Sequence, residues 1–393
     1  MKILVISYAC FRQINRSVYR VMKRTYKDIH LIVPRHILIS SGKELTVEPA
    51  LEGEPHLVPM ELKGKNPRTY FYPDLPLWLE ANQPDIIILE NDPVSKIAFV
   101  VTKWCKKNNR VVIAQSYENL KRDLLSTMRS KRIQAVPVNL VIHAMNYFMA
   151  KRIDGLFVVN KESEVIFNDY GYKNVTRIPL GFDDNVFRLD ELSRQEYRTK
   201  LGLKNDVVLI AYFGRLVRQK GVHLLLEALN EIKELNWKLL IDSHHDNEDE
   251  YTIQVLELIS KFGMIDRVLY FEANHFEIAK YMRAADIMVA PSITTPRFKE
   301  QYGRAVQEAM ACGCIPLVSD SGHLKDLVET QSLVFKESDI TTLRSKLVNL
   351  IQDSETRTGL RDSLSHRAST YLTVNAQARE VSRLIKNINS PTK

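Results

Sequence analysis

The stretch PSITTPRFKEQYGRAVQEAMACGCIPLVSDSGHLKDLV, from Pro291 to Val328, is the most informative part of this chain. Its pattern predicts a polar loop ending in Glu300, a helix that starts after Gly303 and carries Glu308, and a short apolar strand after Gly313. A helix start offers unpaired backbone N–H groups and the positive end of a dipole, which both suit a phosphate. Ionised carboxylates accept hydrogen bonds, so they suit the hydroxyl groups of a ribose or a hexose. Together these features indicate a nucleotide sugar as the ligand.

A second segment, YFGRLVRQKGVHLLLEAL (Tyr212–Leu229), places two cations directly after a predicted strand that ends in Gly214. Arg215 can bind a diphosphate bidentately, and Lys220 can act on it as a compact point charge. Taken alone, the pair would be better explained as two ordinary cations in a surface loop. The carboxylates downstream favour a binding site instead.

The E-x7-E pattern of Glu300 and Glu308, followed by AMACGCIPLVSDSG, resembles the retaining glycosyltransferases of family 4 (glycosyl transferases group 1). Tyr212–Leu229 is similar to the phosphate-clamp segment of that family, and IPLGFDDNVF (Ile178–Phe187) is similar to its interdomain signature. The resemblance is strong over residues 150–330 and weak in the flanks. It implies the α/β GT-B fold, with two doubly wound Rossmann-like domains that face each other across a cleft.

The resemblance also implies roles for individual residues. Glu300, Arg215 and Lys220 are the implied catalytic residues, and Glu308 is implied to hold the donor ribose. Two roles stay open for Glu300, that of a nucleophile and that of a group that stabilises an oxocarbenium-like state, because the front-face mechanism favoured for the family needs no covalent intermediate. The implied donor-binding set is Gly214, Arg215, Lys220, Glu300, Gln301, Tyr302, Gly303, Arg304 and Glu308.

The sequence departs from the family pattern in its first half. The Gly-Gly loop that commonly follows the first strand is replaced by Tyr8 to Arg12, without glycine. The position after a later strand that the family often fills with histidine has none in Gln115 to Asn119. A polar loop at a strand end explains the latter segment as well as an acceptor site does. The acceptor-side candidates are Arg12, Gln115, Glu118 and Asn119.

The length and the strand pattern predict two α/β domains. The chain has 393 residues, and soluble domains usually have about 100–200 residues. Continuous apolar runs alternate with helical segments, as in parallel sheets that are covered on both faces. We expect an acceptor-binding domain at 1–182, completed by a C-terminal helix within 374–393, and a nucleotide-sugar-binding domain at 183–373. The expected strands lie in KILVISYA, IHLIVP, PDIIILE, VVIAQS, GLFVVN, VVLIAYFG, WKLLIDS, RVLYFEA, DIMVAPS, CIPLVSD and SLVFK.

Cysteine usage and hydropathy exclude several classes of protein. The four cysteines are scattered, and the C-x-C of Cys312 and Cys314 has no partner pair to complete a zinc site. We therefore expect free thiols, no metal and no cofactor. The first apolar run is interrupted at Arg12, which favours a buried strand over a signal peptide. No stretch approaches the roughly 18 apolar residues of a membrane span.

The positive charge of the chain is concentrated in its first half. Up to Asp184 there are 27 Lys and Arg against 19 Asp and Glu, whereas the remainder has 28 against 28. A basic patch beside the amphipathic segment Val136–Arg152 suits peripheral docking on an anionic membrane. A solvated basic face beside an ordinary core helix explains the pattern equally well. No recognised nucleic-acid motif is found. The basic cluster comprises Lys103, Lys106, Lys107, Arg110, Lys121, Arg122, Arg129, Lys131 and Arg132.

These observations predict a metal-independent, retaining glycosyltransferase of polysaccharide or glycoconjugate biosynthesis. Its partners would be a nucleotide sugar and a glycan, lipid-linked or small-molecule acceptor, without nucleic acid. We expect it in the cytoplasm, with docking at the inner face of the membrane as the finer hypothesis. The alternative is a non-catalytic GT-B scaffold or glycan-binding subunit, which the missing Gly-Gly loop favours. An epimerase or a phosphorylase of the same fold fits the motifs less well.

Overall fold

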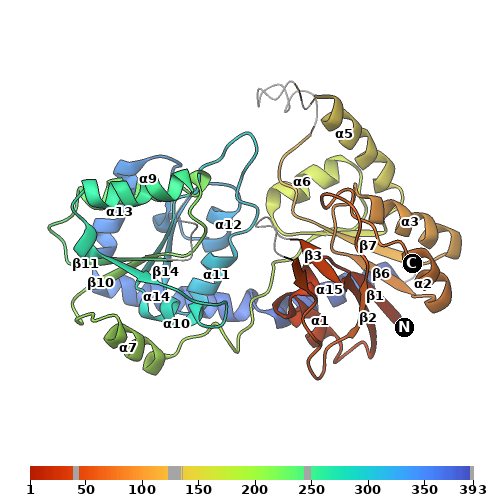
Figure 1. Ribbon diagram of the computed structural model, residues 1–393, viewed down its shortest axis with the longest axis horizontal. Helices are drawn as coiled ribbons and strands as arrows, with labels where there is room; N and C mark the ends of the chain where they lie inside the picture. The colour runs from red at the N-terminus through yellow and green to blue at the C-terminus, as the bar shows by residue number, and fades with distance from the viewer. Residues whose placement is uncertain (39–43, 123–133, 135, 243–248, 390–393) are drawn as a thin grey trace. The chain divides into compact units, whose positions relative to one another are not determined.

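The computed structural model describes residues 1–38, 44–122, 134, 136–242 and 249–389 (Figure 1). The chain divides into two compact units. The first contains Met1–Gly181 and the C-terminal segment from Val374, and the second is Phe182–Thr373. The boundary lies inside the segment IPLGFDDNVF, one residue before the predicted position. Of the basic cluster, Arg129, Lys131 and Arg132 lie outside the described residues.

The first unit is built on a seven-stranded parallel sheet with the order β5-β2-β1-β6-β7-β8-β9. From β1, the next strands along the chain are added on one side of the sheet. From β6 onward, the strands are added on the other side, so the strand order reverses between β1 and β6. The strands are β1 (Lys2–Ile6), β2 (Asp28–Pro34), β5 (His56–Met60), β6 (Ile86–Leu89), β7 (Val111–Ser116), β8 (Gly155–Val158) and β9 (Val175–Arg177). A separate antiparallel pair consists of β3 (His36–Leu38) and β4 (Glu44–Thr46).

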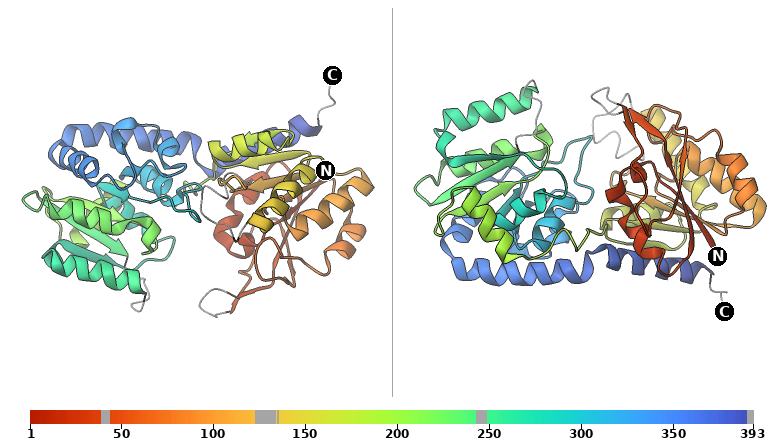
Figure 2. Two further views of the ribbon diagram at one scale, coloured as in Figure 1. Left: turned by 90° about the horizontal axis from the view of Figure 1, so that it is seen from above. Right: turned by 60° about the horizontal axis from the view of Figure 1, so that its bottom comes forward.

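Helices cover both faces of this sheet, as Figure 2 shows from two directions. Alternate residues of β1 pack into different cores: Leu4 lies in a cluster with Ile97 of α3. Ile3 lies in another cluster with Tyr19 of α1 and Leu384 of α15. This explains why the strands read as continuous apolar runs. The helices are α1 (Ser17–Met22), α2 (Leu75–Asn82), α3 (Lys96–Asn108), α5 (Val136–Ala150), α6 (Lys161–Asp169) and α15 (Val374–Asn389).

The second unit repeats the design with a six-stranded parallel sheet in the order β12-β11-β10-β13-β14-β15. Here the order reverses between β10 and β13. The strands are β10 (Val208–Tyr212), β11 (Trp237–Asp242), β12 (Val268–Phe271), β13 (Ile287–Ala290), β14 (Ile315–Ser319) and β15 (Val334–Phe335). The helices are α7 (Glu191–Lys200), α8 (Val222–Asn230), α9 (Glu250–Lys261), α10 (Ile278–Ala284), α11 (Arg304–Ala311), α12 (Leu324–Val328), α13 (Ile340–Gln352) and α14 (Ser354–Tyr371).

The two parallel sheets confirm the predicted doubly wound α/β class. In such sheets ligands bind beyond the carboxyl ends of the strands, at the point where strand order reverses. Each unit therefore has one such switch point, at β1/β6 in the first and at β10/β13 in the second. Within the described residues, no helix is both long and apolar enough to span a bilayer.

Candidate active site

An ion pair marks the switch point of the second unit. Lys220 ends the short 3-10 helix that follows β10, and its Nζ pairs with Oε1 of Glu300. The same oxygen accepts a hydrogen bond of 2.7 Å from Oγ of Ser292, which follows β13. Glu300 is only 7% exposed. The ends of the two switch-point strands thus hold one carboxylate between a cation and a hydroxyl group.

Two glycines allow the loops of this site to approach so closely. Gly221 has φ +70°, and a Cβ there would lie 2.0 Å from the carbonyl oxygen of Pro291. Gly322 has φ +52°, and a Cβ there would lie 2.0 Å from the carbonyl oxygen of Glu300. The backbone N–H of His323 donates to that same oxygen at 3.1 Å. The loop that carries Glu300 is therefore held by backbone contacts that a side chain would prevent.

Arg215, the second predicted cation, lies in a different environment from Lys220. It follows Gly214 directly, and its carbonyl oxygen accepts a hydrogen bond of 2.8 Å from the hydroxyl of Tyr212. Its side chain is exposed, and it takes part in no ion pair between described residues. The structure thus brings Lys220, but not Arg215, onto Glu300. An exposed guanidinium keeps its donors available for a bound anion.

Helix α11 begins after Gly303 and buries the second predicted carboxylate. Glu308 is 6% exposed, and burial raises its pKa to about 7. Arg304, 3.8 Å away on the preceding turn, lowers that pKa in opposition. Tyr302 is buried, with its hydroxyl donating to Gln307 at 2.8 Å, so only its backbone suits the predicted donor contact. Gln301 is exposed beside it.

The acceptor-side candidates in the first unit separate into two places. Arg12 pairs with Glu48 at 3.2 Å, and their side chains are 51% and 38% exposed. Gln115, Glu118 and Asn119 lie together at the carboxyl end of β7. Glu118 is held in an ion-pair network with Arg68 and Arg122, so its carboxylate is already engaged.

Sequence reasoning missed the strand end next to β7. Glu90 follows β6, and its Oε1 accepts a hydrogen bond of 2.5 Å from the hydroxyl of Tyr19. Burial raises the pKa of this carboxyl group, although hydrogen bonds from Ser7, Tyr19 and Cys10 act against that. The signal was available, since Glu90, Asn91 and Asp92 directly follow the apolar run PDIIIL. Ser292 was missed because a serine in a polar loop carries no local signature.

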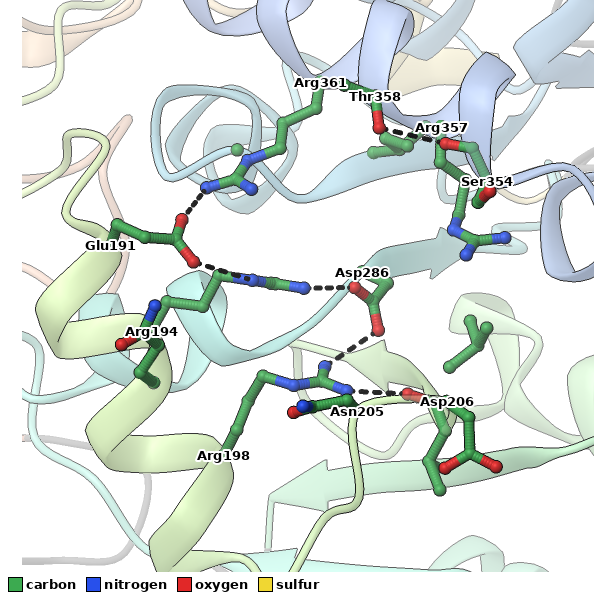
Figure 3. Close-up of a pocket in the computed structure, with 15 residues that line it drawn as sticks. Glu191, Arg194, Arg198, Asn205, Asp206, Asp286, Ser354, Arg357, Thr358 and Arg361 are labelled. Atoms are coloured by element: carbon green, nitrogen blue, oxygen red, sulfur yellow. Dashed lines mark hydrogen bonds and ion pairs between the residues drawn. The ribbon is translucent and has the colours of Figure 1, made fainter.

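A cavity of about 510 Å³ opens at the opposite edge of the second sheet, near the starts of β10 and β14 (Figure 3). The arginines that line this cavity are already engaged in ion pairs and hydrogen bonds within the second unit. Arg194 and Arg198 both pair with Asp286, and Arg361 pairs with Glu191 at 2.7 Å. Arg357 donates to two carbonyl oxygens at the end of α13, at 2.6 and 2.8 Å. We interpret this cluster as a network that ties α7 and α14 to the sheet.

No metal site accompanies the candidate active site in the part of the chain that is described. No group of three or more His, Cys, Asp or Glu side chains there could hold an ion. All four cysteines are buried free thiols, as the sequence predicted. Cys312 and Cys314 form no such group with any other side chain that the structure describes.

Comparison with known proteins shows which proteins this chain is similar to. Residues 193–367 match the family model of the glycosyl transferases group 1. The solved structure of HepE from Anabaena, in complex with UDP and glucose, is similar over 98% of this chain and 100% of that chain, with a TM-score of 0.73 and 16% identity. Residues 193–367 of the second unit are thus similar to the glycosyl transferases group 1, and the chain has the GT-B fold.

Sequence relatives are also glycosyltransferases. An uncharacterized glycosyltransferase of Methanocaldococcus jannaschii is 29% identical over 200 residues, covering 48% of this chain and 48% of that protein. The D-inositol 3-phosphate glycosyltransferase of Stackebrandtia nassauensis is 27% identical over 224 residues, covering 53% of this chain and 48% of that protein. The chain thus spans about half the length of the curated relatives that it matches.

Proposed function

We propose that this chain is a retaining, metal-independent glycosyltransferase. It moves a sugar from a nucleotide-diphosphate sugar, bound by the second unit, to an acceptor hydroxyl in glycan, polysaccharide or glycoconjugate biosynthesis. The observation that carries the proposal is the pairing of Lys220 with the buried carboxylate of Glu300 at the β10/β13 switch point. This pairing lies inside the segment that matches the family model.

In the proposed binding step, the donor diphosphate competes with Glu300 for Lys220. A diphosphate carries more charge than a carboxylate, so it takes over the ammonium group and adds the exposed Arg215 as a second cation. Glu300 then keeps its hydrogen bond from Ser292, and the place on Oε1 that Lys220 leaves accepts a hydrogen bond from a hydroxyl of the transferred sugar. Donor binding thus exchanges an internal ion pair for contacts to both ends of the donor.

In the proposed chemical step, Glu300 stabilises positive charge on the sugar ring without bonding to it. A carboxylate that is 7% exposed acts through a low local dielectric, which strengthens its effect on an oxocarbenium-like state. The leaving phosphate accepts the proton of the acceptor hydroxyl, so the nucleophile enters from the face that the phosphate leaves. The positive charge that balances the leaving group comes from Arg215 and Lys220, and this is the ground for metal independence.

Glu308 is proposed to hold the ribose of the donor. Ribose hydroxyl groups that donate to an ionised carboxylate lower its pKa, because they stabilise the charged form. The raised pKa of about 7 makes this group sensitive to such a partner. Its neighbour Arg304, 44% exposed, is placed to support the ionised form.

We also propose that the protein docks on the inner face of an anionic membrane through α5. Besides Ile142 and Met149, this helix buries Asn139 and Asn146, which are each 6% exposed, and it leaves Val138 and Val141 61% and 63% exposed. Phe148 stacks on Phe99 of α3 at 6.0 Å, and it is itself 38% exposed. An apolar face of this kind suits insertion at the headgroup boundary.

Positively charged residues next to α5 favour docking on an anionic membrane surface. The guanidinium of Arg152 lies 4.2 Å from the ring centroid of Phe148, at the end of α5. On the neighbouring helix α3, Lys103 and Lys106 are exposed. Basic residues near an apolar face add roughly 1 kcal/mol each on anionic lipid. Arg110 and Lys107 of the predicted cluster contribute less, because they pair with Asp85 and Glu80.

Thermal unfolding of the full chain with UDP, GDP, ADP and their sugars, with and without EDTA, tests the transferase proposal. A ligand that binds only the folded state raises the transition temperature with its concentration. We expect one nucleotide to act selectively and EDTA to change nothing. A shift that EDTA removes would contradict metal independence, and the absence of any shift would favour the non-catalytic scaffold.

A further inference from the structure

A groove lined with positive charge lies between helices α1 and α15 of the first unit. The two helices are neighbours on one face of the first sheet (Figure 1). Between them is a cavity of about 520 Å³, which is within the size range of small-molecule sites. Met22 and Thr25, at and just after the end of α1, line one side of this α1/α15 groove, and Ala378 and Ser382 of α15 line the other. The short side chains of α15 leave the space open.

Three cations of α15 also line the groove. Arg379, Arg383 and Lys386 are all exposed, and their spacing of four and three residues places them on one face of the helix. No carboxylate is among the described residues that line the groove. Arg379 forms no ion pair with any residue that the structure describes. Arg383 pairs with Glu380 at 2.9 Å, but its side chain is 70% exposed, and an exposed pair of this kind is weak.

The stability of α15 alone does not explain this row of cations. The helix dipole favours a cation in the last turn, which accounts for Lys386. Arg379 lies in the first half of the helix, where the dipole gives no such benefit. Arg379 and Arg383 are also like charges at i and i+4, and such a pair destabilises a helix. An anion bound between the two guanidinium groups would remove this repulsion.

The cavity of the second unit shows how the fold uses arginines for its own stability (Figure 3). Four arginines line that cavity together with Glu191, Asp206 and Asp286, and ion pairs join several of them. In the α1/α15 groove, three cations are present without a carboxylate in the lining. The lining itself therefore has a net positive charge, which an anion from outside the chain can balance.

The chemistry of the groove favours a phosphate ester. A phosphate monoester carries about −1.5 to −2 charges near pH 7, whereas a carboxylate carries one. Arginine binds phosphate oxygens bidentately, and the hydroxyl groups of Thr25 and Ser382 can donate to the same oxygens. A phosphate group alone would leave much of the groove empty. Val21 and Met22 offer an apolar surface to the carbon part of a larger ligand.

The groove is at the opposite edge of the first sheet from its switch point. Met22 and Thr25 come shortly before Asp28, the first residue of β2. Near the end of α15, Ile388 lies against Gly155, the first residue of β8. Both helices thus end beside the amino ends of parallel strands, whereas ligands at a switch point lie beyond the carboxyl ends. The α1/α15 groove is therefore separate from the strand ends at the β1/β6 switch point.

We propose that the α1/α15 groove binds a phosphate ester, with the phosphate on Arg379, Arg383 and Lys386 and the carbon part on Met22. The proposal concerns the first unit alone and does not depend on the proposed transferase function. A soluble metabolite and a phospholipid headgroup present the same phosphate chemistry, so a soluble probe and a vesicle are both needed to separate them.

Isothermal titration calorimetry of the full chain with glycerol 3-phosphate tests the soluble source. We expect binding to the parent, and much weaker binding of acetate, which has a single charge. Arg379→Gln/Arg383→Gln should lower the affinity for glycerol 3-phosphate at least about tenfold, because two charge-assisted contacts are lost. Both side chains are exposed, so the unfolding temperature without ligand should not fall. Lys220→Met, which alters the second unit, should bind glycerol 3-phosphate like the parent.

Two further variants separate a built site from general attraction to positive charge. Lys103→Gln/Lys106→Gln removes the same charge from exposed positions of α3 in the same unit, and it should bind glycerol 3-phosphate unchanged. Ser382→Leu keeps all three cations of the groove but fills part of its space. It should weaken binding, and this result does not depend on the loss of any charge.

Vesicles that contain phosphatidic acid test the lipid source. If no soluble ester binds, Arg379→Gln/Arg383→Gln and Ser382→Leu should each lower vesicle binding relative to the parent, which would assign the groove to a headgroup. The proposal would be overturned if neither variant differed from the parent toward glycerol 3-phosphate or toward these vesicles. It would also be overturned if acetate bound as tightly as glycerol 3-phosphate, or if Lys103→Gln/Lys106→Gln lost as much affinity for that ester as Arg379→Gln/Arg383→Gln.

Discussion

Lys220 and Glu300 are 80 positions apart in the chain, yet they form a partly buried ion pair at the carboxyl ends of β10 and β13. The relative exposure of their side chains is 24% for Lys220 and 9% for Glu300. Removal of one partner from such a pair leaves an uncompensated charge, whereas removal of both does not. Substitutions of Lys220 and Glu300 can therefore test whether the donor diphosphate competes with Glu300 for Lys220.

Variants of this pair should affect nucleotide binding in opposite directions. Lys220→Met should weaken the affinity for a nucleoside diphosphate by about 10- to 100-fold, because a charge-assisted hydrogen bond is worth roughly 1.5–3 kcal/mol. Glu300→Gln should bind the same nucleotide as well as or better than the parent, because the competitor of the diphosphate is gone, and it should lose transfer activity. Isothermal titration calorimetry measures both affinities.

The double variant Lys220→Met/Glu300→Gln is the control for stability. It should recover much of the free energy of unfolding that Lys220→Met loses, while nucleotide binding stays weak. A Glu300→Gln variant that binds nucleotide more weakly than the parent would show that the carboxylate supports the diphosphate rather than competing with it.

Glu308 should give the folded protein a pH-dependent stability. Its pKa is about 7 in the folded state and 4.5 as the ordinary value. Between these two pH values the folded state binds more protons than the unfolded state, so its stability falls as pH rises. The contribution is fully present below pH 4.5 and is lost as pH rises through 7, with an upper size of about 3 kcal/mol. The free energy of unfolding, measured with denaturant, should be larger at pH 5 than at pH 8. Glu308→Gln should abolish the part of this difference that comes from Glu308.

The same group should couple nucleotide binding to proton release. Ribose hydroxyl groups favour the ionised carboxylate, so binding near pH 6.5 should release a fraction of a proton. Calorimetry in buffers that differ in ionisation enthalpy measures this number. Glu308→Gln removes the titrating group, so its binding enthalpy should lose that buffer dependence. An identical proton release in the parent and the variant would remove Glu308 from the ribose site.

Gly221→Ala should disrupt both stability and nucleotide binding. The new methyl group would meet the carbonyl oxygen of Pro291, so the loop that carries Lys220 must move away from Ser292 and Glu300. Gly202→Ala is a matched control, since Gly202 has a similar φ of +66° with nothing within 4 Å of the added Cβ. The control should cost only about 1–2 kcal/mol of backbone strain. Chemical denaturation and nucleotide titration should separate the two variants, and equal losses would contradict the close-approach argument.

Vesicle binding should depend on the exposed face of α5. Val141→Asp places a charge on the apolar face, and we expect binding to phosphatidylglycerol vesicles to fall at least about tenfold, since a buried apolar side chain is worth roughly 1.5–3 kcal/mol. Leu192→Asp is the control, because Leu192 on α7 is 82% exposed and remote in the chain. Sedimentation with phosphatidylcholine vesicles should show little binding for any variant. Equal binding of the parent and Val141→Asp would exclude α5 as the docking surface.

Local features of the sequence were sufficient for much of the fold. Strand β6 and similar strands of the two parallel sheets are continuous apolar runs in the sequence, because both faces of a parallel sheet are covered. Helix α3 begins after Ser95, a residue type that favours helix starts, and the side chain of Ser95 caps it by accepting from the N–H of Ala98 at 3.2 Å. Strands β5 and β9 were missed, since β5 contains Pro59 and β9 has only three residues. Their pairing with neighbours stabilises them more than their own composition does.

The sequence by itself determined the two α/β units, the approximate boundary between them and the helix after Gly303 that carries Glu308, because apolar periodicity and glycine positions act over short stretches. Only the tertiary structure decided which polar groups meet. The pairing of Lys220 with Glu300, the α1/α15 groove and the outward apolar face of α5 all depend on strand order and packing. Residues far apart in the chain become neighbours in a parallel sheet only through crossovers, and no local pattern encodes that distance.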